Sequence, residues 1–134
     1  MANNNKGLPV LDLVGRILLA LIFVFAAMGK IMNYHGTAAY MSTYGIPTGV
    51  LPLVIAIELL GGLMVIIGLW TRWAAFILAA FSATAITIFH HTFSTPLDQI
   101  LTLAEVSFTG GLIVLGAHGP SCLSVDAWLK RKKA

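Results

Sequence analysis

Charged residues are scarce in this sequence. Only 10% of the 134 residues are Asp, Glu, Lys or Arg, whereas 58% are hydrophobic, and the mean hydropathy is +0.91. Because a soluble domain has charges on about a quarter of its residues, this chain has too little polar surface to remain dissolved in water. Composition therefore excludes an ordinary soluble enzyme and predicts an integral membrane protein with a single domain over residues 1–134.

Cysteine pairs and metal-ligand patterns are also missing. Cys122 is the single cysteine, which excludes an internal disulfide and a dithiol relay within the chain. The sequence has no Glu-x-x-His pattern and no close Cys/His spacing, so we predict no metal site. Haem needs two histidines that face each other at one depth. His35 and His118 belong to opposite faces of the membrane and His90 and His91 to one helix, so we do not expect haem.

What the sequence has instead is long hydrophobic blocks, at about residues 10–32, 50–69, 73–93 and 97–117. Each block contains about 20 residues. At ~1.5 Å per residue, a helix of that length crosses the ~30 Å hydrocarbon layer of a bilayer. The sequence therefore predicts an all-α integral membrane protein, a bundle of four transmembrane helices.

Two polar segments accompany these blocks. Residues 33–49 contain three tyrosines, which favours an outer loop with a short interfacial helix at about 37–44. The tail, residues 118–134, has four consecutive basic residues at 130–133. A terminal basic cluster beside a membrane span is ordinarily a topology signal and a contact for anionic headgroups, so we do not expect a nucleic-acid partner.

The other basic residues are distributed unevenly across the predicted membrane. Four spans place both chain ends on one side, which also carries Lys6, Arg16 and Arg72, whereas Lys30 lies on the other side. By the positive-inside rule, we expect both termini and the basic tail in the cytoplasm.

Three ionisable residues, Arg16, Glu58 and Glu105, fall inside the predicted spans. Each costs at least ~2.5–3.5 kcal/mol near the bilayer centre, so such residues usually face the bundle interior and have partners. Glu58 and Glu105 both lie about 8 residues from the outer end of a span, or roughly 10–12 Å deep at helical rise. We predict a buried ion pair between Arg16 and Glu58, which either fixes helix register or belongs to a site for a ligand or a proton.

His90 and Lys30 lie near the outer ends of their spans. Small residues on the His90 face, together with Gly61 and Gly62, allow close helix approach, which would bring His90 towards Glu58 and Glu105. A histidine beside carboxylates titrates near neutral pH and suits proton transfer or a hydrogen bond to a quinone carbonyl. Solvation of His90 at the interface is the alternative. Lys30 either closes the outer mouth of this pocket or extends to the headgroups.

Several short motifs occur in a recognisable order. Their order and spacing resemble the DoxX family of small bacterial inner-membrane proteins over residues 10–117, and the motifs are Arg16, Gly29-Lys30, Gly45-Ile46-Pro47, Glu58 with Gly61-Gly62, and Gly68-Leu69-Trp70-Thr71-Arg72. The resemblance implies a four-helix fold in a bacterial inner membrane. Some relatives are subunits of quinone-linked oxidoreductases, including thiosulfate-oxidising ones, or of membrane complexes concerned with redox stress.

These patterns lead to one functional hypothesis and two alternatives. The hypothesis is a membrane subunit of a quinone-linked oxidoreductase system, in which Arg16, Lys30, Glu58 and His90 bind the ligand and Glu58, His90 and Glu105 relay protons. No residue here can itself cycle two electrons, so a quinone or the cofactor of a redox-protein partner has to take them. The alternatives are a small-solute transporter built on the same polar layer and a non-catalytic assembly or anchoring partner. The candidate protein partners are a redox protein or a second copy of this chain.

Overall fold

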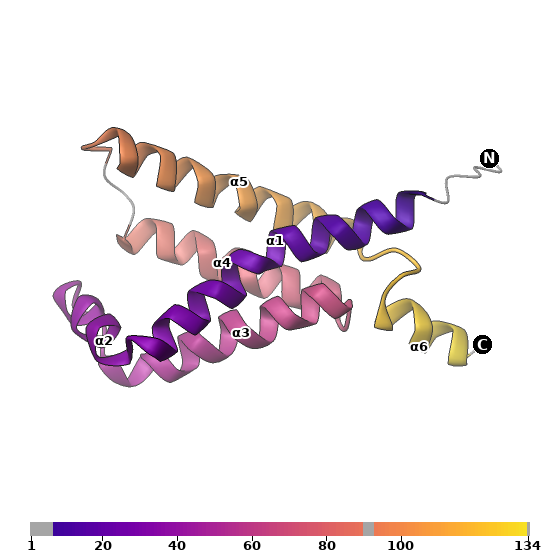
Figure 1. Ribbon diagram of the computed structural model, residues 1–134, viewed down its shortest axis with the longest axis horizontal. Helices are drawn as coiled ribbons and strands as arrows, with labels where there is room; N and C mark the ends of the chain where they lie inside the picture. The colour runs from indigo at the N-terminus through magenta and orange to yellow at the C-terminus, as the bar shows by residue number, and fades with distance from the viewer. Residues whose placement is uncertain (1–6, 90–92, 134) are drawn as a thin grey trace.

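The computed structural model describes residues 7–89 and 93–133 of the chain. Within these residues all regular secondary structure is helical, and the helices long and apolar enough to cross a membrane are α1 (Gly7–Met32), α3 (Leu51–Ile67, preceded by a 3₁₀ turn at Thr48–Val50), α4 (Thr71–Phe89) and α5 (Pro96–His118). This architecture confirms the predicted four-helix membrane fold (Figure 1).

Two short helices lie outside the spans. The segment for which the sequence predicts a short helix at about 37–44 contains α2 (Tyr34–Thr43). The tail contains α6 (Val125–Lys133), which the sequence analysis described only as a basic segment. Both described chain ends lie at one end of the bundle and α2 lies at the other (Figure 1). We call these the basic end and the α2 end.

Local sequence signals account for the helix boundaries. The side chain of Thr95 accepts the backbone N–H of Asp98, and the Asp98 carboxylate accepts the N–H of Thr95, so this capping box starts α5 directly before Pro96. Gly68 ends α3 with φ at 79°, in the left-handed region where glycine carries no steric penalty. Helix α4 follows after only Leu69 and Trp70.

Close packing of α3 depends on its glycine pair. A Cβ atom on Gly61 would lie 2.9 Å from Leu78 on α4, and one on Gly62 would lie 3.1 Å from Val24 on α1. The hydrogen side chains therefore let α3 approach both neighbours, which is how small residues act in membrane helix packing. The remaining large contact joins α4 to α5.

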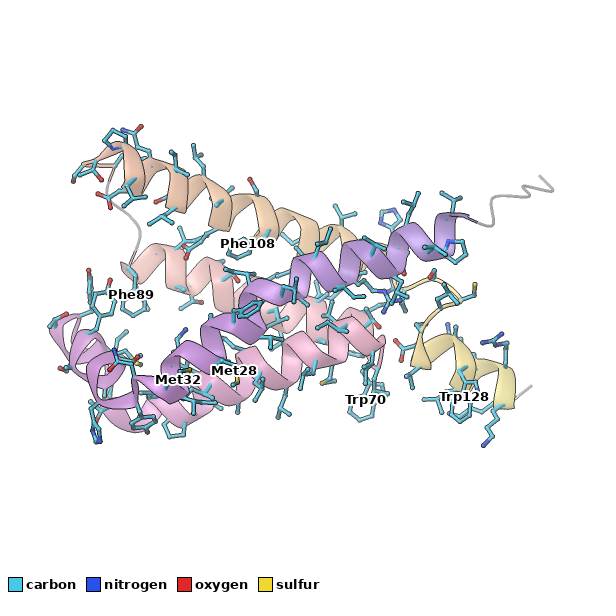
Figure 2. All side chains as sticks on the ribbon, in the orientation of Figure 1. Met28, Met32, Trp70, Phe89, Phe108 and Trp128 are labelled. Atoms are coloured by element: carbon cyan, nitrogen blue, oxygen red, sulfur yellow. The ribbon has the colours of Figure 1, made fainter. Side chains whose placement is uncertain are left out.

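Apolar side chains cover the outside of the bundle, as a lipid-facing surface requires. Figure 2 shows Met32 and Phe89 towards the α2 end and Trp70 and Trp128 at the basic end, and Met32 is 83% exposed. The exposed aliphatic and aromatic residues on all four long helices would aggregate in water but are solvated by lipid chains.

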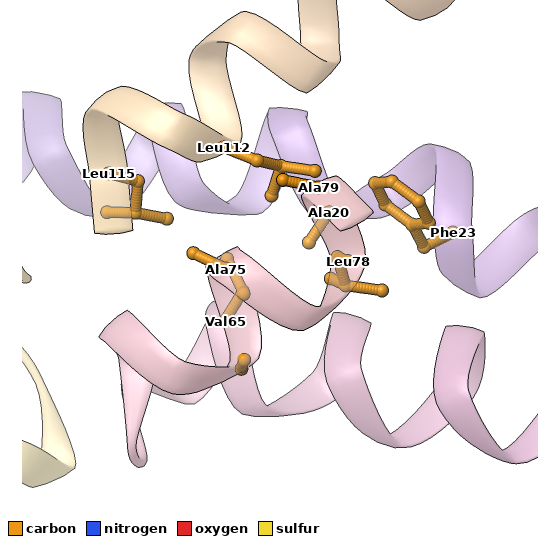
Figure 3. Close-up of a cluster of buried hydrophobic side chains, with 9 residues drawn as sticks. Ala20, Phe23, Val65, Ala75, Leu78, Ala79, Leu112 and Leu115 are labelled. Carbon is orange, nitrogen blue, oxygen red and sulfur yellow. The ribbon is translucent and has the colours of Figure 1, made fainter. Parts of the chain in front are cut away.

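The buried core lies towards the basic end. Its side chains come from the middle of α1, the end of α3, the first half of α4 and the second half of α5 (Figure 3), and they are Ala20, Phe23, Val65, Ala74, Ala75, Leu78, Ala79, Leu112 and Leu115. Four of the nine are alanines, so the helices come close there. Towards the α2 end, the ribbons of α3 and α5 diverge (Figure 1).

Candidate functional site

A cavity of about 530 Å³ lies between the long helices on the α2 side of the core. Aliphatic and aromatic side chains form most of its wall. The polar side chains that line it come from all four long helices and α2, and they are Lys30, Thr37, Tyr40, Glu58, Ser82, Thr84 and Glu105. A mostly apolar cavity with a few convergent polar groups is the usual form of a small-molecule site.

The charged centre of this cavity is an ion pair between Lys30 and Glu58. The Lys30 ammonium donates to Glu58 Oε1 at 3.1 Å and lies 2.9 Å from Oε2. The Glu58 side chain is only 6% exposed, whereas that of Lys30 is 25% exposed. No residue in the described part of the chain gives Oε2 a well-directed hydrogen bond. Both oxygens contact the ammonium, and the second lone pair of each can accept from a donor on a ligand.

Glu105 reaches the same cavity from α5. Its side chain is half-buried, and it lines the cavity beside Phe108, whose ring packs edge-on against Phe23 of α1 with centroids 5.5 Å apart. The two acids that the sequence analysis assigned to one layer thus line one cavity from two helices. Together with Lys30, these acids are ionisable side chains in an otherwise mostly apolar wall.

Tyr40 of α2 and Phe89 of α4 both line the cavity, and Tyr44, directly after α2, packs with them. Tyr40 stacks on Phe89 with ring centroids 5.5 Å apart, and Tyr44 packs edge-on against the same ring at 4.9 Å. A hydrogen bond with Tyr44 raises the pKa of Tyr40 to about 12, with further contributions from burial and from the negative charges of Tyr44 and Glu105. Tyr40 is therefore a neutral hydroxyl at physiological pH.

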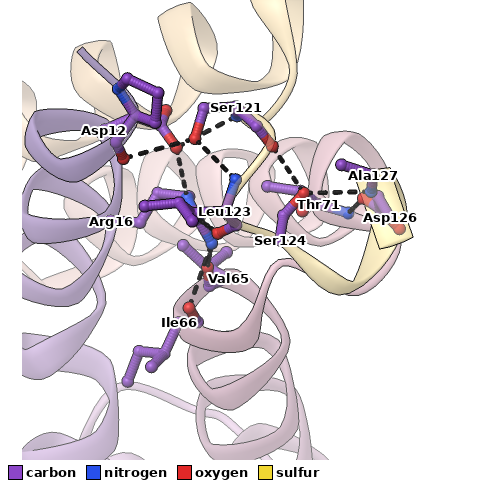
Figure 4. Close-up of polar contacts among 11 residues, drawn as sticks. Asp12, Arg16, Val65, Ile66, Thr71, Ser121, Leu123, Ser124, Asp126 and Ala127 are labelled. Carbon is purple, nitrogen blue, oxygen red and sulfur yellow. Dashed lines mark hydrogen bonds and ion pairs between the residues drawn. The ribbon is translucent and has the colours of Figure 1, made fainter. Parts of the chain in front are cut away.

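Arg16 lies elsewhere, and the predicted Arg16–Glu58 pair is wrong. Figure 4 shows the Arg16 guanidinium at the basic end, where it is buried and donates to Asp12 at 2.9 Å. It also donates to the carbonyls of Val65 and Ile66, each at 3.1 Å, and to that of Leu123. Arg16 thereby satisfies carbonyls at the end of α3 that have no partner within the helix.

Lys30 takes the place predicted for Arg16 because of its depth along α1. Lys30 is 14 residues beyond Arg16 on α1, which is about 21 Å at helical rise, so it is the basic residue of α1 that reaches the level of Glu58. The prediction overestimated the distance that the Arg16 side chain can span towards Glu58. It also overlooked backbone carbonyls as partners, because every residue has one and no sequence pattern marks those that a guanidinium will find.

Two further acids at the basic end were also missed. Asp12 accepts the backbone N–H of Ser121 at 3.1 Å as well as the Arg16 bond. Asp126 accepts the N–H groups of Trp70 at 2.7 Å and Thr71 at 2.9 Å. Through these bonds the tail is attached to α1 and to the α3–α4 turn (Figure 4). An acid four residues before Arg16 and an acid near the start of α6 were the available signals.

The remaining predicted site residue, His90, lies outside the described residues, and its assignment stays a prediction. The structure brings Lys30, Glu58 and Glu105 to one cavity and separates Arg16 from them. Within the described ranges, no three His, Cys, Asp or Glu side chains come together in a way that could hold a metal ion. The groups that this cavity offers a ligand are hydrogen-bond donors, carboxylates and apolar contacts.

Comparisons with known proteins give the following matches. The DoxX family profile matches residues 11–91. "Inner membrane protein YqjF" of Escherichia coli (strain K12) is 37% identical over 120 residues, 90% of this chain and 92% of that protein. "Inner membrane protein YphA" of the same strain is 30% identical over 125 residues, 88% of this chain and 89% of that protein. CatD of Bacillus subtilis (strain 168), whose name describes a proposed oxidoreductase, is 32% identical over 68 residues, 51% of each chain. No solved structure matches the chain.

Substitutions in the ion pair should have unequal costs. We expect Lys30→Met to lower the free energy of unfolding by about 3 kcal/mol, because it leaves the Glu58 carboxylate buried without a counter-charge. Glu58→Leu should cost less, since the partly exposed Lys30 can extend to the surface. The double variant Lys30→Met/Glu58→Leu should recover most of the loss, as exchange of a buried pair for apolar residues often does. Denaturant unfolding in mixed micelles gives the free energy of unfolding of the wild type, the two single variants and the double variant. If the loss in the double variant equals the sum of the two single losses, Lys30 and Glu58 do not interact.

Proposed function

Because this chain belongs to the DoxX family, we propose that it is a membrane subunit of a quinone-linked redox system and that its cavity holds the quinone ring. The resemblance noted from the sequence is confirmed at the level of the family. The observation that carries the functional proposal is the buried Lys30–Glu58 pair, which lines an apolar cavity together with Glu105.

The wall of the cavity suits a quinone ring. The carbonyl oxygens of a quinone need hydrogen-bond donors within an apolar enclosure, and the Lys30 ammonium is such a donor in the cavity wall. The rings of Phe81 and Phe108 offer flat apolar contacts. A ligand soluble in the bilayer can reach such a cavity from the membrane itself.

The charged residues then have distinct roles. A bound quinone supplies two-electron chemistry in which its oxygens gain or lose protons. Lys30 orients a ring oxygen through a charge-assisted hydrogen bond. Glu58 holds or releases a proton at its buried carboxylate, which faces the Lys30 ammonium. Glu105 passes protons between Glu58 and the outer surface, and His90 remains a candidate for the same path.

Electrons have to come from or go to another protein. No side chain among the described residues cycles two electrons, and the long helices that they form are membrane spans. The proposal therefore requires a redox-protein partner. The name of CatD, a partial relative, offers modest support for a link to oxidoreductases.

The proposed location is a bacterial inner membrane with both termini in the cytoplasm. The names of YqjF and YphA support the location. The positive-inside rule supports the orientation, because Arg16, Arg72 and the basic residues of α6 share one end of the bundle and Lys30 points to the cavity at the other. Reporter fusions after residue 133 and within residues 33–49 should report opposite compartments. The same compartment for both fusions would contradict the four-span topology.

A cavity-filling substitution tests ligand binding. Ala85 lines the cavity, whereas Ala83, on the same helix, is exposed and does not line it. We expect decylubiquinone at 100 times its dissociation constant to stabilise the wild type by about 2.7 kcal/mol. Ala85→Leu should lose this stabilisation because the added side chain occupies the ring position.

The matched control is Ala83→Leu, which should keep the stabilisation by decylubiquinone. Thermal unfolding of the three proteins in nanodiscs, with and without the quinone, gives the result. Equal stabilisation of all three proteins would place the quinone outside the cavity. No stabilisation of any would reject the quinone proposal and favour the assembly or anchoring role.

A further inference from the structure

All three tryptophans of the chain lie at the basic end, away from the cavity described above. Trp70, Trp73 and Trp128 are 65%, 73% and 50% exposed, and Figure 2 shows Trp70 and Trp128 on this end of the molecule. Tryptophan collects at the headgroup level of a bilayer, where one edge of the indole is wet and the rest apolar. The basic end therefore lies in the interfacial layer of one leaflet.

The backbone holds Trp70 in a strained conformation. Its φ is 46°, in the left-handed region that a bulky side chain rarely adopts. The Asp126 carboxylate stabilises this turn by accepting the N–H groups of Trp70 and Thr71, and Gly68 accepts the N–H of Asp126 at 2.8 Å. Residues held in sparsely populated conformations often belong to binding sites. Here the strain fixes an exposed indole beside α6.

A second pocket, of about 460 Å³, lies between this turn, the start of α4 and α6. Trp70 and Trp73 line one part of it, and Arg72, Lys130 and Lys133 also line it. Asp126 is the acidic residue among its lining residues, and its carboxylate is engaged by the two backbone N–H groups. The pocket thus combines an excess of positive charge with two indole rings.

We propose that this pocket binds the headgroup of an anionic phospholipid. The phosphodiester pairs with Lys130 and Lys133, whose flexible side chains at the end of α6 can converge on it. Arg72 adds a fixed positive charge while it donates to the carbonyls of Gly116 and Ala117 at 2.8 and 2.6 Å. The indoles of Trp70 and Trp73 pack against the glycerol backbone and the first carbons of the acyl chains.

A lipid fits this pocket better than a soluble anion does. A free phosphate would use the basic residues but leave the two exposed indoles without a function. A lipid headgroup uses both, because it enters the interfacial layer with apolar chains attached. The proposal concerns α6 and the α3–α4 turn, so it is independent of the quinone cavity.

The single cysteine of the chain provides a built-in reporter. Cys122 is exposed and lines the pocket, so a bound headgroup should shield its thiol. The experiment measures the rate of alkylation by the uncharged reagent N-ethylmaleimide on the full chain in nanodiscs. One set of nanodiscs contains phosphatidylcholine alone and the other a mixture with phosphatidylglycerol. We expect phosphatidylglycerol to slow the alkylation of Cys122 by about tenfold.

Two double variants with equal charge loss separate a pocket from general surface attraction. Lys130→Gln/Lys133→Gln removes the two lysines that line the pocket, whereas Arg131→Gln/Lys132→Gln removes neighbours on α6 that do not. Protection of Cys122 should vanish in the first variant and persist in the second. Equal loss in both would overturn the pocket in favour of diffuse attraction, as would no protection in the wild type. Protection by soluble glycerol phosphate in phosphatidylcholine nanodiscs would show a soluble-anion site and also overturn the proposal.

Discussion

A charge in the hydrocarbon layer must find its partner within the protein, because no water is there to solvate it. This constraint organises the whole bundle. At the α2 end, the Lys30 ammonium and the Glu58 carboxylate solve it by pairing across α1 and α3. At the basic end, the buried Arg16 guanidinium donates hydrogen bonds to the Asp12 carboxylate and to three backbone carbonyls. These two sets of contacts differ in how tightly the surrounding side chains are packed.

The hydrogen bonds of Arg16 hold the helices together at the basic end. Its bonds join α1, the end of α3 and the start of the tail, next to a core of small and aliphatic side chains. The Lys30–Glu58 ion pair, by contrast, lies where the helices leave a cavity. There the ion pair stands at the wall of a cavity, and Oε2 of Glu58 has capacity for another donor. Natural proteins commonly keep such incompletely satisfied polar groups at functional sites and support them by rigid packing elsewhere. The packed core and the Arg16 contacts at the basic end thus fix the positions of the helices that line the cavity.

Sequence reasoning predicted the features that depend on composition and periodicity. The four spans and the short helix α2 follow from hydrophobic length and from the tyrosines of the segment between the first two spans. The common layer of Glu58 and Glu105 follows from helical rise alone, and both acids do line one cavity.

Features that depend on which helices touch were not predictable in this way. Helix α1 carries two basic residues within reach of α3, and choosing Arg16 as the partner of Glu58 required the crossing position of two helices, which the sequence does not contain. The attachment of the tail through Asp126 was missed because the donors to its carboxylate are backbone N–H groups exposed by the turn at Trp70. An extramembrane acid in a basic tail gives no sign that it caps a helix 55 residues earlier.

The central claim is that the Lys30–Glu58 pair serves a ligand and is not only a structural lock. An experimental structure of the protein in nanodiscs formed directly from its native membrane tests this most directly. The account predicts density for a bound molecule between α1, α3, α4 and α5, with one of its polar atoms within hydrogen-bond distance of Lys30 Nζ or Glu58 Oε2. A cavity closed by repacked side chains, or filled by an acyl chain that offers the ion pair no polar atom, would contradict it.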